Sequence, residues 1–283
     1  MSFKIIKKQK LNSLVYLFEI KAPLIAEEAK AGQFVMLRID EEGERIPITI
    51  AKTHPQKGII TIIFQEAGKT TRKLATLKEK DNISDMLGPL GKASDFKGAG
   101  KVVFIGGGVG IAEILPVIEY AKKNGNKVTA ILGARTKELI ILEEEIRKSV
   151  DTLIVTTDDG SSGKKGLVTD ALVEVLDKEK FDLAYCVGPD IMMKYVSITT
   201  KKYGLKTLVS LDANMLDATG MCATCRVTVA GETKFTCVDG PEFDGHSVDW
   251  DEFISRQKRF KAEEERALKI FNDWCKCTAG AKK

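Results

Sequence analysis

The residues of this chain with the clearest chemistry are three cysteines close together near its end, in and just after the stretch LDATGMCATC. Cys222 and Cys225 are separated by two residues, and Cys237 follows after eleven more. Thiolates at such short spacing are typical metal ligands. A fourth ligand is then expected, and the residue five positions before Cys222 is the carboxylate Asp217.

The spacing of these four residues indicates which metal they would bind. Position 217, four residues, Cys222, two residues, Cys225 and then Cys237 follow the plant-type [2Fe–2S] pattern, in which the first ligand is cysteine. A zinc ribbon needs a second pair of ligands, which Cys275 and Cys277, or His246, could supply. The spacing favours an iron–sulfur cluster, with zinc and no metal as the alternatives.

Asp217 itself allows two interpretations. A carboxylate oxygen can bind iron and carries the same formal charge as a thiolate. Alternatively, Asp217 only caps a turn beside Gly220, and the fourth ligand lies elsewhere. The undisturbed spacing favours ligation. Because carboxylate donates fewer electrons than thiolate, we expect it to raise the reduction potential of the cluster, as imidazole does in Rieske centres.

A glycine-rich turn is the second feature with chemistry. It follows the apolar run KVVFI and opens a helical pattern, so backbone N–H groups and the helix dipole could hold a pyrophosphate there. A tight turn with close helix–strand packing is the alternative. The residues of this turn are Gly106, Gly107, Gly108, Val109 and Gly110.

Two further chain segments end predicted strands at the same edge of a sheet, where ligands of α/β proteins bind. Gly133 and Arg135 end one strand, and Arg135 could contact a ribose, a 2′-phosphate or only solvent. The loop Cys186–Pro189, with Gly188 and Pro189, ends another. Cys186 fits a buried core position as well as a functional one.

The composition limits the class of protein. A length of 283 residues favours two or more domains, and a net charge of +4 spread along the chain gives no clustered basic face for nucleic acid. Neither the N-terminus nor the apolar stretch 102–121 fits a signal peptide or a membrane span. Clustered cysteines favour a reducing compartment, so we expect a cytoplasmic protein.

The elements that would position these residues fall into four segments. Residues 1–98 contain short strand patterns, a helix at Thr70–Leu77 and a turn at Leu87–Lys92, which predicts a small antiparallel β-barrel. Residues 99–211 alternate strands and helices, including a helix over 138–150, which predicts a parallel sheet with helices on both faces. Residues 212–248 form the cysteine-rich insertion, and residues 249–283 a charged C-terminal helix. The predicted fold is a multidomain α+β protein.

Together these motifs resemble the ferredoxin–NADP reductase family. The resemblance rests on GGGVGIA after a strand, GART after the next, and the Cys186–Pro189 loop. In the first domain, Arg45-Ile-Pro-Ile-Thr49 resembles the motif that holds a flavin and its phosphate, and Gly68–Thr71 resembles the second flavin-phosphate loop. The flavin-site residues implied are Arg45, Pro47, Ile48, Thr49, Gly68, Lys69, Thr70 and Thr71.

The cysteine-rich insertion narrows the resemblance to two groups of subunits. The chain is similar to the electron-transfer subunits of dihydroorotate dehydrogenase, and more so to the small subunit of NADH-dependent ferredoxin:NADP oxidoreductase, also called sulfide dehydrogenase beta subunit. The block Thr156–Asp170, which contains Asp158, is similar to both. The dihydroorotate relatives have cysteine at the first ligand position, whereas the second group has aspartate.

This resemblance implies an electron-transfer flavoprotein with FAD in the barrel, NAD(H) over the flavin and a [2Fe–2S] cluster in the insertion. It also implies a heterodimer with a larger glutamate-synthase-like subunit that carries flavin and [4Fe–4S] clusters and bifurcates electrons between ferredoxin and NAD. An electron-transfer subunit of dihydroorotate dehydrogenase or another NADH-linked oxidoreductase is the alternative, and a zinc-binding subunit without redox function is a more distant one. The residues themselves leave NAD or NADP, the partner, the direction of electron flow and the role of Cys275 and Cys277 open.

Overall fold

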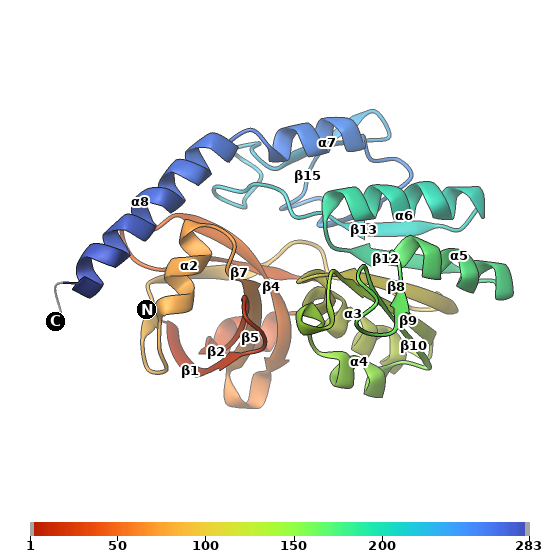
Figure 1. Cartoon of the computed structure of the whole chain (residues 1–283), viewed down its shortest axis with the longest axis horizontal. Helices are drawn as coiled ribbons and strands as arrows, with labels where there is room; N and C mark the ends of the chain where they lie inside the picture. The colour runs from red at the N-terminus through yellow and green to blue at the C-terminus, as the bar shows by residue number, and fades with distance from the viewer. Residues whose placement is uncertain (1–2, 281–283) are drawn as a thin grey trace.

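The computed structural model describes residues 3–280, with side chains described through residue 273. Figure 1 shows an N-terminal barrel beside a parallel sheet, with the cysteine-rich segment and the last two helices lying across both. The prediction of a barrel, a parallel-sheet domain and a small C-terminal iron–sulfur unit is confirmed.

The barrel is a nearly closed antiparallel sheet of seven strands in the order β6-β1-β2-β5-β4-β3-β7. Alternation of buried and exposed side chains along these strands directs one set of apolar residues inward, where Phe18, Phe64 and Leu37 are fully enclosed. The elements are β1 (Phe3–Lys10), β2 (Val15–Lys21), α1 (Pro23–Glu28), β3 (Phe34–Arg38), β4 (Arg45–His54), η1 (Pro55–Lys57), β5 (Ile59–Gln65), α2 (Lys69–Thr76), β6 (Asn82–Ile83) and β7 (Asp85–Leu90).

The second sheet has the strand order β11-β10-β9-β8-β12-β13-β16, and β8 to β13 run parallel. Its strands are almost continuously apolar because helices cover both faces. The elements are β8 (Lys101–Gly107), α3 (Gly110–Lys123), β9 (Lys127–Ala134), η2 (Lys137–Leu139), α4 (Glu143–Ser149), β10 (Thr152–Thr157), β11 (Lys164–Lys165), α5 (Val168–Lys178), β12 (Leu183–Val187), α6 (Asp190–Lys202) and β13 (Thr207–Ser210).

The two faces of this sheet carry separate apolar cores. One core packs α3 and α4 against the sheet, and the other packs α5 and α6. The chain order reverses between β8 and β12, so the loops after these two strands diverge and leave a crevice at their carboxyl ends. Helix α3, which begins in that crevice, also packs against barrel strand β4.

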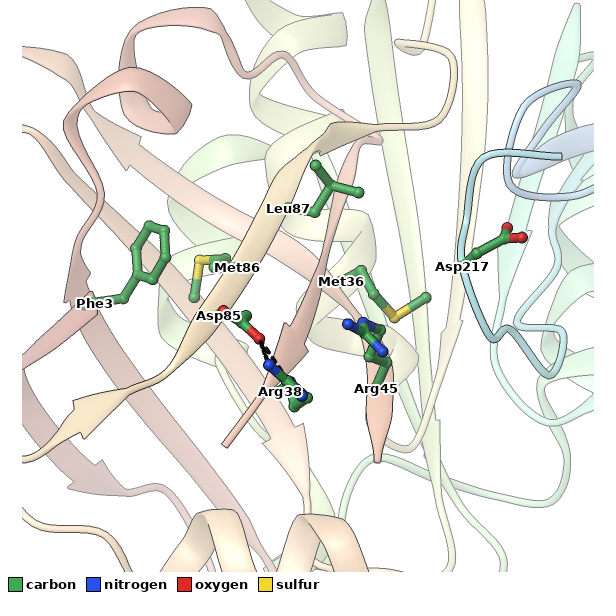
Figure 2. A pocket seen from close by; sticks show the side chains of 8 residues that line it. All are labelled: Phe3, Met36, Arg38, Arg45, Asp85, Met86, Leu87 and Asp217. Carbon is green, nitrogen blue, oxygen red and sulfur yellow. Dashed lines mark hydrogen bonds and ion pairs between the residues drawn. The ribbon is translucent and has the colours of Figure 1, made fainter. Parts of the chain in front are cut away.

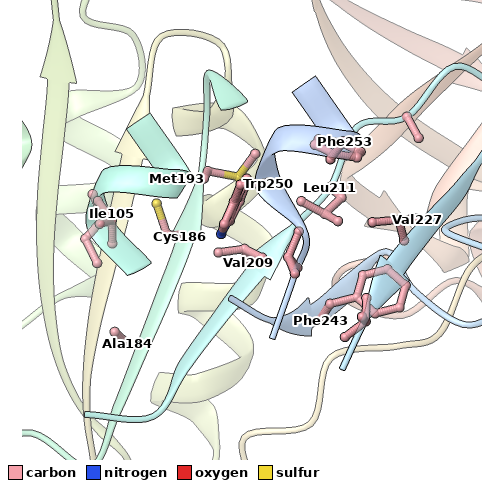
Figure 3. Packing of buried hydrophobic residues seen from close by; sticks show 14 of the residues in the cluster. Ile105, Ala184, Cys186, Met193, Val209, Leu211, Val227, Phe243, Trp250 and Phe253 are labelled. Carbon is pink, nitrogen blue, oxygen red and sulfur yellow. The ribbon is translucent and has the colours of Figure 1, made fainter. Parts of the chain in front are cut away.

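The cysteine-rich segment is tied into this second sheet. It contains the hairpin β14 (Arg226–Val229) and β15 (Glu232–Phe235), and then β16 (Glu242–Asp244), which pairs antiparallel with β13. Figure 3 shows its residues Val227 and Phe243 in one apolar cluster with Val209 of the sheet. The insertion is therefore continuous with the sheet and its core.

The C-terminal segment differs from the single helix that the charge pattern predicts. Helix α7 (Trp250–Gln257) buries Trp250 and Phe253 in the core, and a turn separates it from α8 (Lys261–Gly280). Helix α8 is mostly exposed and runs back to α2 of the barrel (Figure 1). The helix is interrupted there because α7 is held in the core, whereas α8 runs in a different direction toward the barrel.

The prediction of one helix over 138–150 is also wrong in part. Only the short 3-10 turn η2 and α4 are helical, and Leu142 between them has a left-handed backbone with φ of 54°. Ile141 is buried against the sheet, so packing overrides the local helix preference. Helix α1, which the sequence does not indicate, begins at Pro23, a position where proline is well tolerated.

Within the described part of the chain, no helix combines the length and apolar character that crossing a bilayer requires.

Candidate functional site

A cavity of about 420 Å³ lies in the crevice between β8 and β12. The glycine turn after β8 and the loop after β12 form two of its sides, as the strand order requires. Residues from β5, β13 and α7 close the others. The lining residues are Gln65, Gly107, Gly108, Val109, Gly110, Glu113, Val187, Gly188, Pro189, Asp190, Ser210, Asp212 and Gln257.

The glycines of this turn have identifiable structural reasons. Gly108 has φ of 58° and open space around it, which suits glycine at the tip of the turn. At Gly110, a Cβ would lie 2.6 Å from the carbonyl oxygen of Val187, so helix α3 approaches β12 only because this residue is glycine. Gly106 and Gly107 are equally crowded, by Ile114 and Met192. The glycines thus serve close packing, and the open tip at Gly108 leaves room for a ligand.

A carboxylate of α3 enters the cavity beside the barrel. The Thr49 hydroxyl of β4 donates a hydrogen bond of 3.1 Å to Glu113. Burial and, to a smaller extent, the nearby Asp212 raise the pKa of Glu113 to about 7, against the opposing effect of the Thr49 hydroxyl. Burial also raises the pKa of Asp190 to about 6. This cavity therefore presents carboxyl groups that change charge near neutral pH.

The same strand, β4, borders a second cavity of about 520 Å³ on the cluster side of the barrel. Arg45, Pro47 and Thr49 alternate along β4 and so lie on one face of it. Figure 2 shows Arg45 and Met36 on the barrel side of this cavity and Asp217 on the opposite loop. Arg38 pairs with Asp85, but among the described side chains none forms an ion pair with Arg45. Arg45 is thus a cation available to an anionic ligand.

The start of α2 already binds an anionic group. Gly68 caps this helix, and the Glu44 carboxylate accepts hydrogen bonds from the Thr70 hydroxyl (2.5 Å) and from Lys69 (3.3 Å). The Thr70 hydrogen bond holds the pKa of Glu44 below its ordinary value. A Cβ at Gly68 would meet nothing within 4 Å, so there is room for a ligand beside the turn. These donors fit a flavin phosphate.

The structure brings two of the four predicted cluster ligands together. The sulfurs of Cys225 and Cys237 are 3.3 Å apart, both residues are 2% exposed, and they form no disulfide. With metal–sulfur bonds of about 2.3 Å, two thiolates on one tetrahedral ion lie roughly 3.8 Å apart, so this pair fits one metal with little movement. Cys222 is exposed on the same loop.

Asp217 adopts the turn-capping geometry. One of its carboxylate oxygens accepts the Thr219 N–H (2.8 Å) and the other the Cys222 N–H (3.0 Å). These bonds, with that of Thr219 the strongest, hold the pKa of Asp217 below its ordinary value. Each oxygen keeps a free lone pair, so capping does not prevent metal binding.

Other candidate ligands lie elsewhere. Among the side chains that the structure describes, no three of His, Cys, Asp or Glu are close enough to share one metal ion. A zinc site completed by His246 is not formed, because this ring lies 3.0 Å from the Thr200 hydroxyl of α6. Cys275 and Cys277 lie outside the described side chains.

The remaining predicted residues lie around the rim or in the core. Arg135 and Asp158 are exposed at the ends of β9 and β10, outside the cavity, and the Asp158 N–H donates to the Ala134 carbonyl. Gly133 is buried against Val168 of α5. Cys186 is fully buried in the apolar cluster of Figure 3, and burial raises the pKa of its thiol well above the usual range.

Sequence reasoning missed the cavity residues that come from distant elements, namely Gln65, Glu113, Asp190, Ser210, Asp212 and Gln257. A usable signal exists for Glu113, because it is the acidic residue among otherwise apolar positions in the first two turns of α3. Asp190 and Asp212 directly follow the β12 loop and β13, at the sheet edge where ligands bind.

A flavin-type barrel packed against a parallel-sheet nucleotide domain, with cysteines on an attached loop, defines an electron-transfer protein of the ferredoxin reductase class. Two family models match: the iron–sulfur cluster binding domain of dihydroorotate dehydrogenase B over residues 212–249, and the oxidoreductase NAD-binding domain over residues 104–197. The chain belongs to the family of dihydroorotate dehydrogenase B electron-transfer subunits and their homologues.

Individual relatives support this assignment over nearly the full length. The chain is 46% identical to a homologue of the dihydroorotate dehydrogenase B electron-transfer subunit from Thermotoga maritima, over 95% of each chain. It is 33% identical to the electron-transfer subunit of Desulforamulus reducens, over 83% of this chain and 93% of that one. It also resembles a chain in the solved structure of NADH-dependent reduced ferredoxin-NADP oxidoreductase, with a TM-score of 0.91 and 45% identity over 95% of this chain and 97% of that one.

These findings confirm several predictions. The protein is an oxidoreductase electron-transfer subunit with an NAD-binding domain, an iron–sulfur domain and a fold of the FAD-binding type. Its homologues are subunits of heteromeric complexes, which implies a partner subunit.

Proposed function

We propose that this chain is the NADH-side subunit of an electron-bifurcating NADH-dependent reduced ferredoxin:NADP oxidoreductase. Its partner would be a larger glutamate-synthase-like subunit with flavin and [4Fe–4S] clusters. The 45% identity to a chain in the structure of such a complex supports this reading. A homologue of the dihydroorotate dehydrogenase B subunit is 46% identical, so identity alone does not separate the two complexes. The aspartate at the first ligand position supports it as well.

The observation that supports the electron-transfer role is that β4 lines one cavity and contacts a lining residue of the other. Thr49 contacts Glu113 in the nucleotide cavity, and Arg45 lines the cavity that Asp217 closes. A flat cofactor bound along this face would lie between the nucleotide turn and the cysteine loop. In this proposal the flavin site lies between the nucleotide site and the cluster site.

Each site has residues suited to its group. Arg45 and the donors at the start of α2 would offset the phosphate charge of FAD, while the side chains of Pro47 and Thr49 and the backbone of Ile48 would contact its ring. The glycine turn with Gly188 and Pro189 would hold NAD(H), and Arg135 and Asp158 would lie near its ribose. Asp217, Cys222, Cys225 and Cys237 would hold the cluster.

When bound, the flavin would exchange two electrons with NAD(H) as a hydride and single electrons with the cluster, which is the chemistry of the cofactor. The protein supplies position and charge. Glu44 must leave the start of α2 for a phosphate to bind there, and Glu113 can take up or release a proton beside the β4 face.

An absorption spectrum of the anaerobically purified protein tests the cofactor content. Flavin bands with a broad iron–sulfur shoulder are expected, whereas a colourless protein that contains zinc would refute the proposal. Co-purification tests the partner. A large flavin and iron–sulfur subunit is expected, and a dihydroorotate dehydrogenase instead would assign the chain to the alternative complex.

A further inference from the structure

The last turn of α7 is attached to the loop that carries the cysteines. Arg256 donates one hydrogen bond from Nε to the carbonyl of Arg226 (3.1 Å) and one from Nη2 to the carbonyl of Thr224 (3.2 Å). These two residues flank Cys225 in the sequence. A single guanidinium is therefore hydrogen-bonded to the backbone on both sides of one buried cysteine.

This contact also brings a fixed positive charge close to Cys225. Arg256 is half-buried, and Cys225 is 2% exposed. Burial and the nearby Arg226 and Arg259 lower the pKa of Arg256, whereas Glu252 and Cys225 oppose this. Arginine stays protonated nevertheless. The end of α7 beside the loop therefore carries several positive charges close together.

The neighbouring residue ties the same turn to the nucleotide cavity. Gln257 lines that cavity, donates to the carbonyl of Asp212 and accepts from the Asn214 N–H (3.4 Å). The end of α7 is thereby fixed from two directions, and Arg256 has little freedom to move away from the cysteine loop. A charge held this rigidly acts on a nearby redox centre with little loss to reorganisation.

We propose that Arg256 is a positioning residue that raises the reduction potential of the cluster bound at Cys225. The inference rests on the proposed function, since it requires the cluster. Reduction adds one negative charge to the cluster, and a fixed positive charge beside a ligand favours the reduced form. The hydrogen bonds to both flanking carbonyls keep the charge of Arg256 at a constant distance from the ligand loop.

Redox titration of the cluster, followed by electron paramagnetic resonance in the complete protein, tests this. Arg256→Gln removes the charge, Arg256→Lys keeps it, and Arg266→Gln removes the same charge from exposed α8 as a matched control. Arg256→Gln is expected to favour the oxidised cluster by about tenfold at a given potential, a downward shift of about 59 mV for one electron. Arg256→Lys should stay near wild type, and the flavin potential should not change in any variant.

Several results would overturn the inference. It fails if Arg256→Gln shifts the cluster potential no more than Arg266→Gln does, or if Arg256→Lys falls as far as Arg256→Gln. Should Arg256→Gln retain no iron, restoration of wild-type iron content by Arg256→Lys supports the positioning role, and lack of restoration refutes it. A wild-type protein without a [2Fe–2S] signal would refute the proposed function itself, and this inference with it.

Discussion

In the proposed cluster site, Asp217 would have two tasks that use different electron pairs of one carboxylate. Both of its oxygens accept backbone N–H groups of the cysteine loop, and this holds the loop in its turn. Ala218 and Ala223 of the same loop have left-handed backbones, with φ of 60° and 54°, which costs about 1–3 kcal/mol each. The capping bonds offset part of this strain. If Asp217 binds the proposed cluster, it serves the loop as well as the metal.

The electronic effect of this carboxylate is testable. Asp217→Cys is expected to lower the reduction potential of the cluster, because thiolate donates more electron density than carboxylate. Redox titration measures the change, and Glu145→Cys, which adds a thiol on exposed α4, serves as the control. An unchanged or higher potential in Asp217→Cys would show that Asp217 does not tune the cluster.

Glu113 makes the stability of the protein depend on pH. Its pKa of about 7 in the folded chain lies above the ordinary value of 4.5, so the unfolded chain loses this proton first as pH rises. The contribution to stability is complete below about pH 4.5 and is lost as pH rises through about 7. Glu113→Gln should remove this loss, on the order of 1–3 kcal/mol between pH 5 and 8.

Urea unfolding at pH 5 and pH 8 without nucleotide measures this difference. Glu119→Gln, on the exposed side of the same helix, controls for the loss of an acidic residue. The idea fails if wild type and Glu113→Gln lose equal stability between the two pH values.

At the scale of elements, substitution of two glycines tests helix packing at one position and ligand binding at the other. Gly110→Ala places a Cβ 2.6 Å from the Val187 carbonyl oxygen and should lower the free energy of unfolding by about 1–3 kcal/mol. Gly68→Ala meets nothing within 4 Å, so its stability should change by less than about 0.5 kcal/mol. Gly68→Ala should nevertheless retain less FAD, because the added methyl group narrows the approach to the start of α2.

Urea midpoints and the FAD content per protein distinguish the two effects. Equal stability of the two variants would contradict the packing argument for α3. Full FAD retention in Gly68→Ala would contradict the flavin-phosphate assignment at α2.

The elements that were predicted share one property: each has a local sequence pattern long enough to indicate its secondary structure. The strands KVVFI and KVTAILGA are predicted by their apolar runs, and the turn after the first strand is predicted by its glycines. Strand β16 has three residues and no apolar run, and it exists because β13 offers it an edge. Glu113 and Gln257 enter the cavity from separate elements, and only tertiary packing brings them together.

At the scale of the whole molecule, Glu242 joins segments far apart in sequence. Its carboxylate accepts from the hydroxyls of Ser94, in the link between barrel and sheet, and of Tyr185 on β12. Glu242 itself lies on β16 of the cysteine segment. The predicted boundaries at residues 98, 211 and 248 stay predictions, and this junction shows how closely the segments they separate are tied.

Loss of this junction should make the unfolding of these segments less cooperative. Glu242→Ala leaves two hydroxyls without their acceptor and is expected to cost about 1–3 kcal/mol, whereas exposed Glu232→Ala should cost little. Unfolding followed by tryptophan fluorescence and by far-ultraviolet circular dichroism should coincide in wild type and separate in Glu242→Ala. Coincident transitions at wild-type stability would refute this.

The placement of β16 has a consequence for how the folded chain behaves in a crowded solution. An open parallel sheet ends in unpaired N–H and carbonyl groups, which can recruit a strand from another molecule. Here β16 covers the edge at β13 with an antiparallel strand of three residues, and the opposite edge ends in β11, two lysines long. Both edges are thus short and carry charged residues, which makes them poor templates for pairing, and at one of them the cysteine segment supplies the covering strand.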